Sequence, residues 1–275
     1  MKRLIIPALF IIGVTGMVVD LRVSAQETVV SEASESAQQK TRLSEEIEQL
    51  NEIYRGQLLE YRQAEKQFEI DRDQYEQLET LAAITKVTES AKEAMRLRAQ
   101  VMLTYFELMR VSLIAAENID LTLETAVLQR VSAQQNWLNT HQEALSAATQ
   151  REEFNQLADT FIARKPEFEE VYREANSLFL LGELQSVHNE LIAVADDMTV
   201  AATESGKVSP QAFRETERAV DAVATELDEL WGNLTTAIAE RDTSSFYQRL
   251  AADTEATYSG LNKVISFLKE LLRQL

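Results

Sequence analysis

The sequence predicts an all-α protein: an elongated helical bundle whose helices run up and down and carry coiled-coil-like heptad seams. Three observations support this fold class. The 275-residue chain has only 7 glycines and 3 prolines, far fewer than the turns of a β-sandwich or an α/β fold would need. Apolar residues recur alternately every three and four positions over long stretches. Capping residues and prolines stand at the ends of several of these stretches, where helices begin.

The first 25 residues have the layout of a secretory signal peptide. Two basic residues begin the chain, residues 4–19 are apolar, and small residues precede a cleavage site between Ala25 and Gln26. The apolar run is shorter than the ~20 residues that a membrane-spanning helix needs. We therefore expect an exported protein, periplasmic or extracellular, and the short basic start favours a bacterial one. The alternative is an uncleaved N-terminal anchor that tethers the chain to a membrane, because charged residues lie close to the cleavage site.

The chain is acidic and has no cysteine. Its formal net charge is −18 at pH 7. Bulk electrostatic attraction to nucleic acid or to an anionic membrane is therefore not expected. The absence of cysteine excludes disulfides, thiolate metal sites and a cysteine nucleophile. Without disulfides, packing alone must stabilise the mature fold. No segment after the first 25 residues is apolar enough to predict a membrane span.

A flexible leader and the first heptad seam follow the signal peptide. Residues 26–41 have few large apolar side chains and many serines, glutamates and glutamines, which is typical of a flexible segment. A heptad seam begins at residue 42, and the opposing register of that seam contains two polar residues, Gln57 and Asp71. A bundle tolerates such residues better than a two-stranded coiled coil does. Aromatic residues occupy every seventh position at four places: Tyr54, Tyr61, Phe68 and Tyr75.

The heptad phase then slips at residues 79–85. This slip predicts either a stutter in one long helix or a tight turn between two helices, and the sequence leaves both open. Residues 101–116 are apolar on nearly every side, so we expect them to be the most buried part of the chain. A second seven-residue line consists of methionines: Met95, Met102 and Met109.

Capping signals predict the next two helix starts. Asp120 follows a break at residues 118–120 and is expected to cap a helix over residues 121–148. Thr149 and Glu152 have the spacing of a capping box, in which the first residue and the third helical residue satisfy each other's backbone groups. A new helix is therefore expected to begin there.

Prolines mark the later helices. Pro166 predicts a kink or a helix boundary, because proline disfavours helical dihedrals in the preceding residue. A further helix is expected over residues 167–205, with Gly182 allowing close approach of a neighbouring helix. Ser209 and Pro210 fit the cap and first residue of the next helix. Because only residues 242–244 connect the last two heptad stretches, these two helices should pack antiparallel.

This pattern divides the chain near its middle. We expect a first helical bundle over residues 42–148 and a second over residues 149–275, which would give two three-helix bundles in series. One elongated bundle fits the same pattern.

No motif in the sequence names a reaction, a cofactor or a metal. We therefore predict no catalytic residues, no cofactor and no metal site, and classify the protein as a non-enzyme. The chain's two histidines, His141 and His188, stand outside the spacings that metal-binding helices use. Both are expected to be partly buried and hydrogen-bonded, and the aromatic and methionine lines are expected to pack in the core. Candidates to line a pocket between helices are Tyr105, Trp137 and His141.

The sequence thus favours an exported, non-enzymatic helical-bundle protein of the cell envelope or exterior. Its partner would be another envelope protein or a second copy of itself, contacted through a long helical face. One alternative is a small-molecule-binding or sensory bundle with a pocket between helices. A further alternative is an exported holding chaperone for unfolded proteins.

Overall fold

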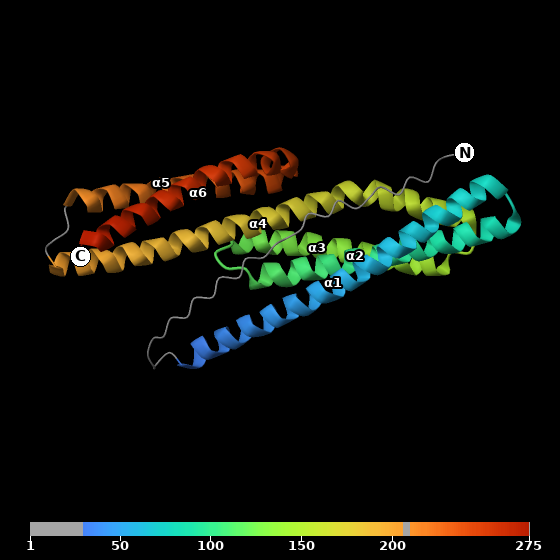
Figure 1. Ribbon diagram of the computed structural model, residues 1–275, viewed down its shortest axis with the longest axis horizontal. Helices are drawn as coiled ribbons and strands as arrows, with labels where there is room; N and C mark the ends of the chain where they lie inside the picture. The colour runs from blue at the N-terminus through green and yellow to red at the C-terminus, as the bar shows by residue number, and fades with distance from the viewer. Residues whose placement is uncertain (1–29, 206–209, 275) are drawn as a thin grey trace. The chain divides into compact units, whose positions relative to one another are not determined.

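The computed structural model describes residues 30–205 and 210–274, and these residues form helices and short connections (Figure 1). The prediction of an all-α fold is confirmed. The predicted signal peptide, its cleavage site at Ala25 and Gln26, and Ser209 lie outside the described residues. The helices are α1 (Val30–Leu78), α2 (Leu81–Ala115), α3 (Leu121–Ala147), α4 (Arg151–Ser205), α5 (Pro210–Glu240) and α6 (Thr243–Gln274).

The chain divides into two compact units, residues 1–39 and residues 40–275. Of the first unit the structure describes residues 30–39, which form the beginning of α1. Most of the segment predicted as a flexible leader, 26–41, is thus helical. Its alanines, glutamates and glutamines favour a helix even where few large apolar side chains are available to pack. All contacts described below belong to the second unit.

The phase slip at residues 79–85 marks a turn and not a stutter. Glu79, directly after α1, has a positive φ of 47°, which reverses the chain direction. The Thr80 hydroxyl then caps α2 by accepting a hydrogen bond from the backbone N–H of Ala83 at 3.3 Å. α1 and α2 therefore form an antiparallel hairpin (Figure 1).

Carboxylates cap the next two helices. The Asp120 side chain accepts hydrogen bonds from Thr122 and Leu123 at the start of α3, as predicted. At α4 the predicted role of Glu152 is wrong by one residue. Glu153 instead accepts from the backbone N–H groups of Thr149 and Gln150, at 2.7 and 2.9 Å. The reason is that α4 begins at Arg151, which makes Glu153 the third helical residue.

Of the two alternatives predicted at Pro166, the helix boundary is wrong, because α4 runs through this residue, and the kink stays a prediction. Proline leaves the carbonyl of Ile162 without its helical partner. Pro166 and Ile162 both lie on the exposed side, where water can satisfy that carbonyl. Phe161 and Phe168 are buried on the opposite side.

Two glycines allow close packing. A Cβ on Gly182 of α4 would lie 2.9 Å from the backbone oxygen of Glu117, so the close neighbour is the α2–α3 connection and not the helix that the sequence predicts. In α6, a Cβ on Gly260 would lie 2.8 Å from Val223 of α5. This contact, together with the short connection between the helices, shows that α5 and α6 pack antiparallel.

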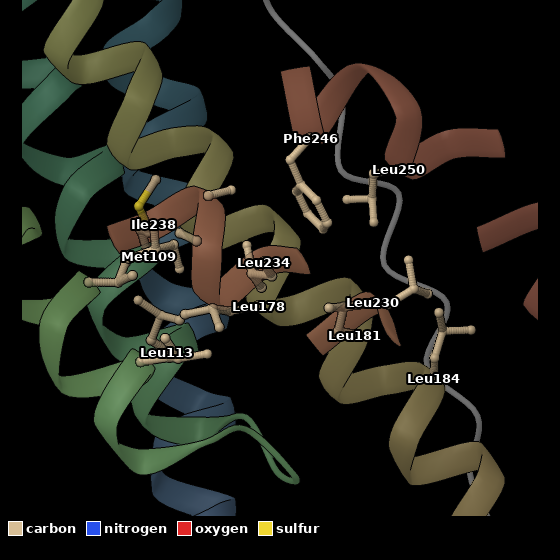
Figure 2. Packing of buried hydrophobic residues seen from close by; sticks show 14 of the residues in the cluster. Met109, Leu113, Leu178, Leu181, Leu184, Leu230, Leu234, Ile238, Phe246 and Leu250 are labelled. Carbon is tan, nitrogen blue, oxygen red and sulfur yellow. The ribbon is translucent and has the colours of Figure 1, made fainter. Parts of the chain in front are cut away.

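α4 is the central element of the hydrophobic core. One cluster of buried apolar residues runs from α2 and α3 across α4 to α5 and α6. In Figure 2, Leu178 of α4 lies near Met109 and Leu113 of α2, while Leu181 and Leu184 lie near α5. The division into bundles at residues 42–148 and 149–275 stays a prediction, because α4 packs with helices from both stretches.

Candidate functional site

The three pocket candidates fall into two aromatic clusters. Trp137 and His141 of α3 stack with their ring centroids 4.9 Å apart, and both contact Phe161 of α4. Tyr105 of α2 does not contact Trp137 directly. The rings of Phe106 and Phe168 lie between them, since Tyr105 contacts Phe106, Phe106 contacts Phe168, and Phe168 contacts Trp137. The structure thus brings Trp137 and His141 together but leaves Tyr105 apart, and their role in lining a pocket stays a prediction.

A buried arginine that the sequence reasoning did not single out lies in the first of these clusters. Arg98 of α2 is 4% exposed, its guanidinium lies 3.8 Å from the Phe161 ring centroid, and its Nε has no hydrogen-bond partner. Burial lowers the pKa of Arg98 and, together with this neighbouring cation, lowers that of His141 to about 4. His141 is therefore a neutral stacking partner at neutral pH. The sequence could have pointed to Arg98, because it is a basic residue on the apolar side of residues 94–101.

Four tyrosines from four helices form the second cluster. Tyr54 of α1, Tyr105 of α2, Tyr172 of α4 and Tyr247 of α6 follow one another with ring centroids 5.7, 6.1 and 6.4 Å apart. Burial raises the pKa of Tyr105 and raises that of Tyr172 to about 12, so both hydroxyls stay protonated at neutral pH. This cluster ties the middle of α1 to three other helices.

Most of the other patterned residues pack as predicted. Tyr61 and Phe68 of the aromatic line are buried, while Tyr54 and Tyr75 are half-buried. Met95 and Met109 lie in hydrophobic clusters, and Met102 packs against one of them. His188 is buried and its Nε2 lies 3.2 Å from the Val220 carbonyl oxygen, so the expectation of a hydrogen-bonded histidine is confirmed there. The Nε2 of His141 has no partner.

A buried ion pair joins α3 and α4 to the end of α5. Glu174 of α4 is fully buried, and one of its carboxylate oxygens contacts the guanidinium of Arg130. Arg130 also donates to the carbonyl of Ile238, in the last turn of α5, at 3.2 Å. The second carboxylate oxygen of Glu174 has no partner. Burial raises the pKa of Glu174 to about 7, against the opposing effects of Arg130 and Arg241.

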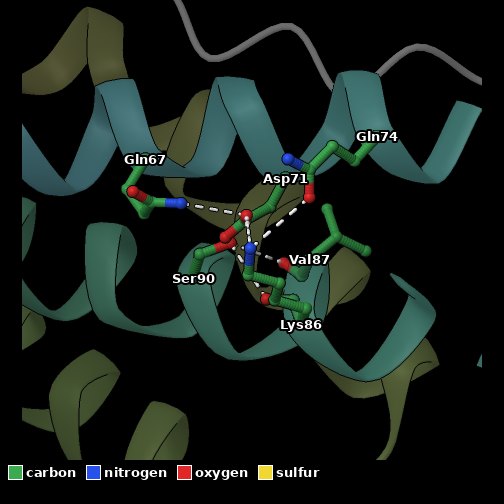
Figure 3. Close-up of polar contacts among 6 residues, drawn as sticks. All are labelled: Gln67, Asp71, Gln74, Lys86, Val87 and Ser90. Atoms are coloured by element: carbon green, nitrogen blue, oxygen red, sulfur yellow. Dashed lines mark hydrogen bonds and ion pairs between the residues drawn. The ribbon is translucent and has the colours of Figure 1, made fainter. Parts of the chain in front are cut away.

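A second buried carboxylate lies between α1 and α2 (Figure 3). Asp71 is 2% exposed; Lys86 lies 3.0 Å from its carboxylate, and Gln67 donates to it at 2.9 Å. The Lys86 ammonium also donates to Gln74 at 3.4 Å. Burial alone would raise the pKa of Asp71, but hydrogen bonds from Lys86, Ser90 and Gln67 outweigh burial and lower it. This network fixes the register of the α1–α2 hairpin close to its turn.

The turn itself exposes two large apolar side chains. Leu78 is 63% exposed and Leu81 is 80% exposed, and every residue from 76 to 82 is exposed. Glu76 and Glu79 lie beside these leucines. We call residues 76–82 the hairpin tip. Turns usually carry polar residues, so two leucines at this one could have been noticed in the sequence.

Within the described ranges, no group of three or more histidine, cysteine or acidic side chains is arranged to hold a metal ion. No helix among those residues combines the length and apolarity that crossing a bilayer requires. Comparisons with protein families, with curated proteins and with solved structures found no match. Proposals about function therefore rest on the chain's own geometry.

Proposed function

We propose that the protein is an exported, non-enzymatic helical scaffold of the cell envelope or exterior that acts by contacting another protein. The observation that carries the proposal is the incomplete cover over the N-terminal half of α1. Large apolar residues recur there with heptad spacing, and each remains half-buried: Leu43, Ile47, Leu50 and Tyr54. Further along the same line of α1, Tyr61 and Phe68 are buried at 2% and 3% exposure.

The difference in burial between the N-terminal part of the α1 seam and the part at Tyr61 and Phe68 supports a binding role for α1 over a role in bundle packing alone. A heptad seam that only stabilised the fold would gain most from being covered over its whole length, since buried apolar surface contributes about 25 cal/mol per Å². In α1, the apolar seam continues toward the N-terminus beyond the part that the rest of the fold buries. Ile53 and Leu59 add exposed apolar area on the same helix, at 40% and 59% exposure. A partner helix or groove could bury this surface by the helix-in-groove mode.

Crosslinking in intact source cells, followed by mass spectrometry, tests this proposal. We expect one envelope protein to be recovered repeatedly, with crosslinks concentrated on residues 40–60. The mature chain should begin at Gln26, which N-terminal sequencing of the recovered protein checks. Recovery of the chain alone, as a monomer without crosslinked protein, would contradict the proposal. Suppression of aggregation of unrelated unfolded proteins would favour a holding chaperone instead.

A small-molecule-binding bundle is a second candidate, favoured by one observation. The Nε of the buried Arg98 guanidinium has no hydrogen-bond partner, and the Coulombic effects of Tyr61 and Glu65 only partly offset the lowering of the Arg98 pKa by burial. Such a group suits a small anionic ligand beside Trp137 and His141. We expect a carboxylate or phosphate ligand to raise the Tm at saturating concentration, and Arg98→Lys to reduce that rise. An unchanged Tm with acetate, succinate and phosphate would exclude this class of ligand.

A further inference from the structure

The hairpin tip is held firmly although its own side chains face solvent. Lys86 joins Asp71 and Gln74 across the hairpin, two turns or fewer of helix behind the tip (Figure 3). From the side, the guanidinium of Arg151 at the start of α4 lies 5.5 Å from the ring centroid of Tyr75. The Lys86 contacts join the two helices of the hairpin, and the Arg151 contact joins the hairpin to α4. The tip is therefore presented in a fixed orientation, which lowers the entropy lost on binding.

The tip also stands clear of its neighbours. The first polar contacts from α2 to α3 are those of Lys92, which donates to the carbonyls of Ser146 and Ala148 at 3.4 Å. The hairpin continues beyond this level, and Figure 1 shows its end extending past the α3–α4 turn. Leu78 and Leu81 are thus accessible to a partner without movement of any other helix.

The negative charge of the hairpin tip indicates which kind of partner it would bind. Glu76 and Glu79 are exposed beside the two leucines and form no ion pair with another described residue, while Asp73 pairs with Arg72. An apolar knob with a carboxylate rim is complementary to an apolar socket rimmed by lysine or arginine. An anionic membrane is repelled by the same carboxylates. A second copy is disfavoured too, because it brings an equally acidic tip and a formal net charge of −18.

We infer that the hairpin tip is a docking knob, with Leu78 and Leu81 inserting into an apolar socket on a partner protein and Glu76 and Glu79 pairing with basic residues at its rim. This inference rests on the proposed function and names the surface and the partner's chemistry. The leucines supply affinity by burial, and the carboxylates supply orientation and association rate.

The test is site-specific photocrosslinking in intact source cells. A benzophenone amino acid replaces Gln77, which is exposed in the tip, or in a control replaces Thr122, which is exposed at the start of α3. The adduct at position 77 should map to one partner protein, at an apolar segment flanked by lysine or arginine. An adduct to lipid, to a second copy of this chain or to a segment without basic residues would overturn the inference.

Binding to the purified partner then separates the roles of the residues. We expect Leu78→Ser with Leu81→Ser to weaken the Kd at least about 30-fold. Glu76→Gln with Glu79→Gln should weaken it about 3- to 10-fold and flatten its salt dependence. The matched control is Leu121→Ser, since Leu121 is 73% exposed at a different turn; it should leave the Kd unchanged. Wild-type affinity of the leucine variant would overturn the inference.

Failure of this inference can be told apart from failure of the proposed function. Partner crosslinks on residues 40–60 with none from position 77 would leave the scaffold proposal standing and remove the tip from it. No protein partner from either region would remove both. Unfolding curves of the tip variants exclude misfolding as a cause, because these residues are exposed and their replacement should leave the Tm nearly unchanged.

Discussion

The α1–α2 and α5–α6 hairpins use the same helical geometry with different seams. The α5–α6 seam is mainly aliphatic: Leu227 and Leu234 of α5 and Val264 of α6 are at most 1% exposed, and Gly260 brings the two backbones close together. Its buried polar side chains are uncharged threonines, Thr216, Thr254 and Thr257. The α1–α2 seam instead uses large rings, those of Tyr61 and Phe68 among them, and buries the carboxylate of Asp71.

The two seams contribute differently to the fold: we interpret the α5–α6 seam as a source of stability and the α1–α2 seam as a source of a specific register. Aliphatic side chains interdigitate at short range and contribute mainly burial energy, so the α5–α6 hairpin acts as a stable base. A buried ion pair contributes less net stability but penalises every register that leaves it unpaired. We therefore interpret the α1–α2 hairpin as the element whose exact register matters, because it positions an exposed tip and a partly covered seam.

The largest effect is expected in the aliphatic seam. Leu234→Ala should lower the free energy of unfolding by about 3 kcal/mol, because it leaves a cavity at a residue that is 0% exposed. Urea unfolding followed by circular dichroism measures this loss. Leu272→Ala on α6 is the control, since Leu272 is 64% exposed and should change stability by less than about 0.5 kcal/mol. Equal losses at both positions would contradict the packing described here.

The second effect concerns Glu174 and pH. Its folded-state pKa of about 7 is above the ordinary value of 4.5, so folding favours the protonated carboxyl. Its contribution to stability is fully present below pH 4.5 and is lost as the pH rises to about 7, a change of about 3 kcal/mol. The glutamine side chain of Glu174→Gln is neutral at every pH, so the free energy of unfolding of this variant should not show this decline. Parallel stability curves for wild type and variant between pH 5 and 8 would show that Glu174 is ionised throughout.

Asp71 should show the opposite pH dependence. Its folded-state pKa is lowered, so its contribution is present above the unfolded pKa and is lost as the pH falls through the folded pKa. Lys86→Met removes the ion-pair partner and should destabilise the protein by about 2 kcal/mol at pH 7, with a smaller effect at pH 3. Adding Asp71→Leu should recover most of that loss. If the double variant were as unstable as the single one, Asp71 would not be the cause.

Glycine substitutions sharpen the contrast between the hairpins at a smaller scale. Gly260→Ala should cost about 1 kcal/mol or more, because its Cβ would lie 2.8 Å from Val223. Gly56→Ala on α1 meets no atom within 4 Å and should stabilise the protein by about 0.5–1 kcal/mol through better helix propensity. Thermal unfolding should show a lower Tm for Gly260→Ala and a higher Tm for Gly56→Ala. Stabilisation by Gly260→Ala would mean that α5 and α6 pack less closely.

The smallest effect on stability is expected at the hairpin tip. Leu78→Ser and Leu81→Ser replace side chains that are 63% and 80% exposed, so each should change the free energy of unfolding by less than about 0.5 kcal/mol. The same changes are expected to weaken partner binding strongly, so the two measurements together separate folding from docking. A loss of stability above about 1 kcal/mol would mean that the tip packs against the fold.

Local signals predicted the helices well because they depend on nearby residues. Sparse glycine and proline, the Asp120 cap and the start of α5 at Pro210 all describe backbone chemistry within a few positions. The continuity of α4 through Pro166 could not be predicted in this way. It depends on which side of the helix faces water, and that is decided by helices distant in the sequence.

The candidate sites were harder to predict for the same reason. Trp137 and His141 are one helical turn apart, so their pairing was visible in the sequence. Glu174 and Arg130 are 44 positions apart, and their pairing depends on how α3 and α4 pack. Glu174 does lie at helical spacing from Val171 and Leu178, so an acidic residue on an apolar stripe was a signal that could have been used.

The most direct test of a partner-binding α1–α2 hairpin is a photocrosslinking scan in intact source cells. Probes would be placed one at a time at exposed positions of α1 and the tip, residues 42–82, and of the α5–α6 hairpin, residues 211–274. We expect adducts to one protein partner from α1 and the tip, and few from α5–α6. Partner adducts confined to the α5–α6 hairpin, or spread equally over both, would contradict this expectation.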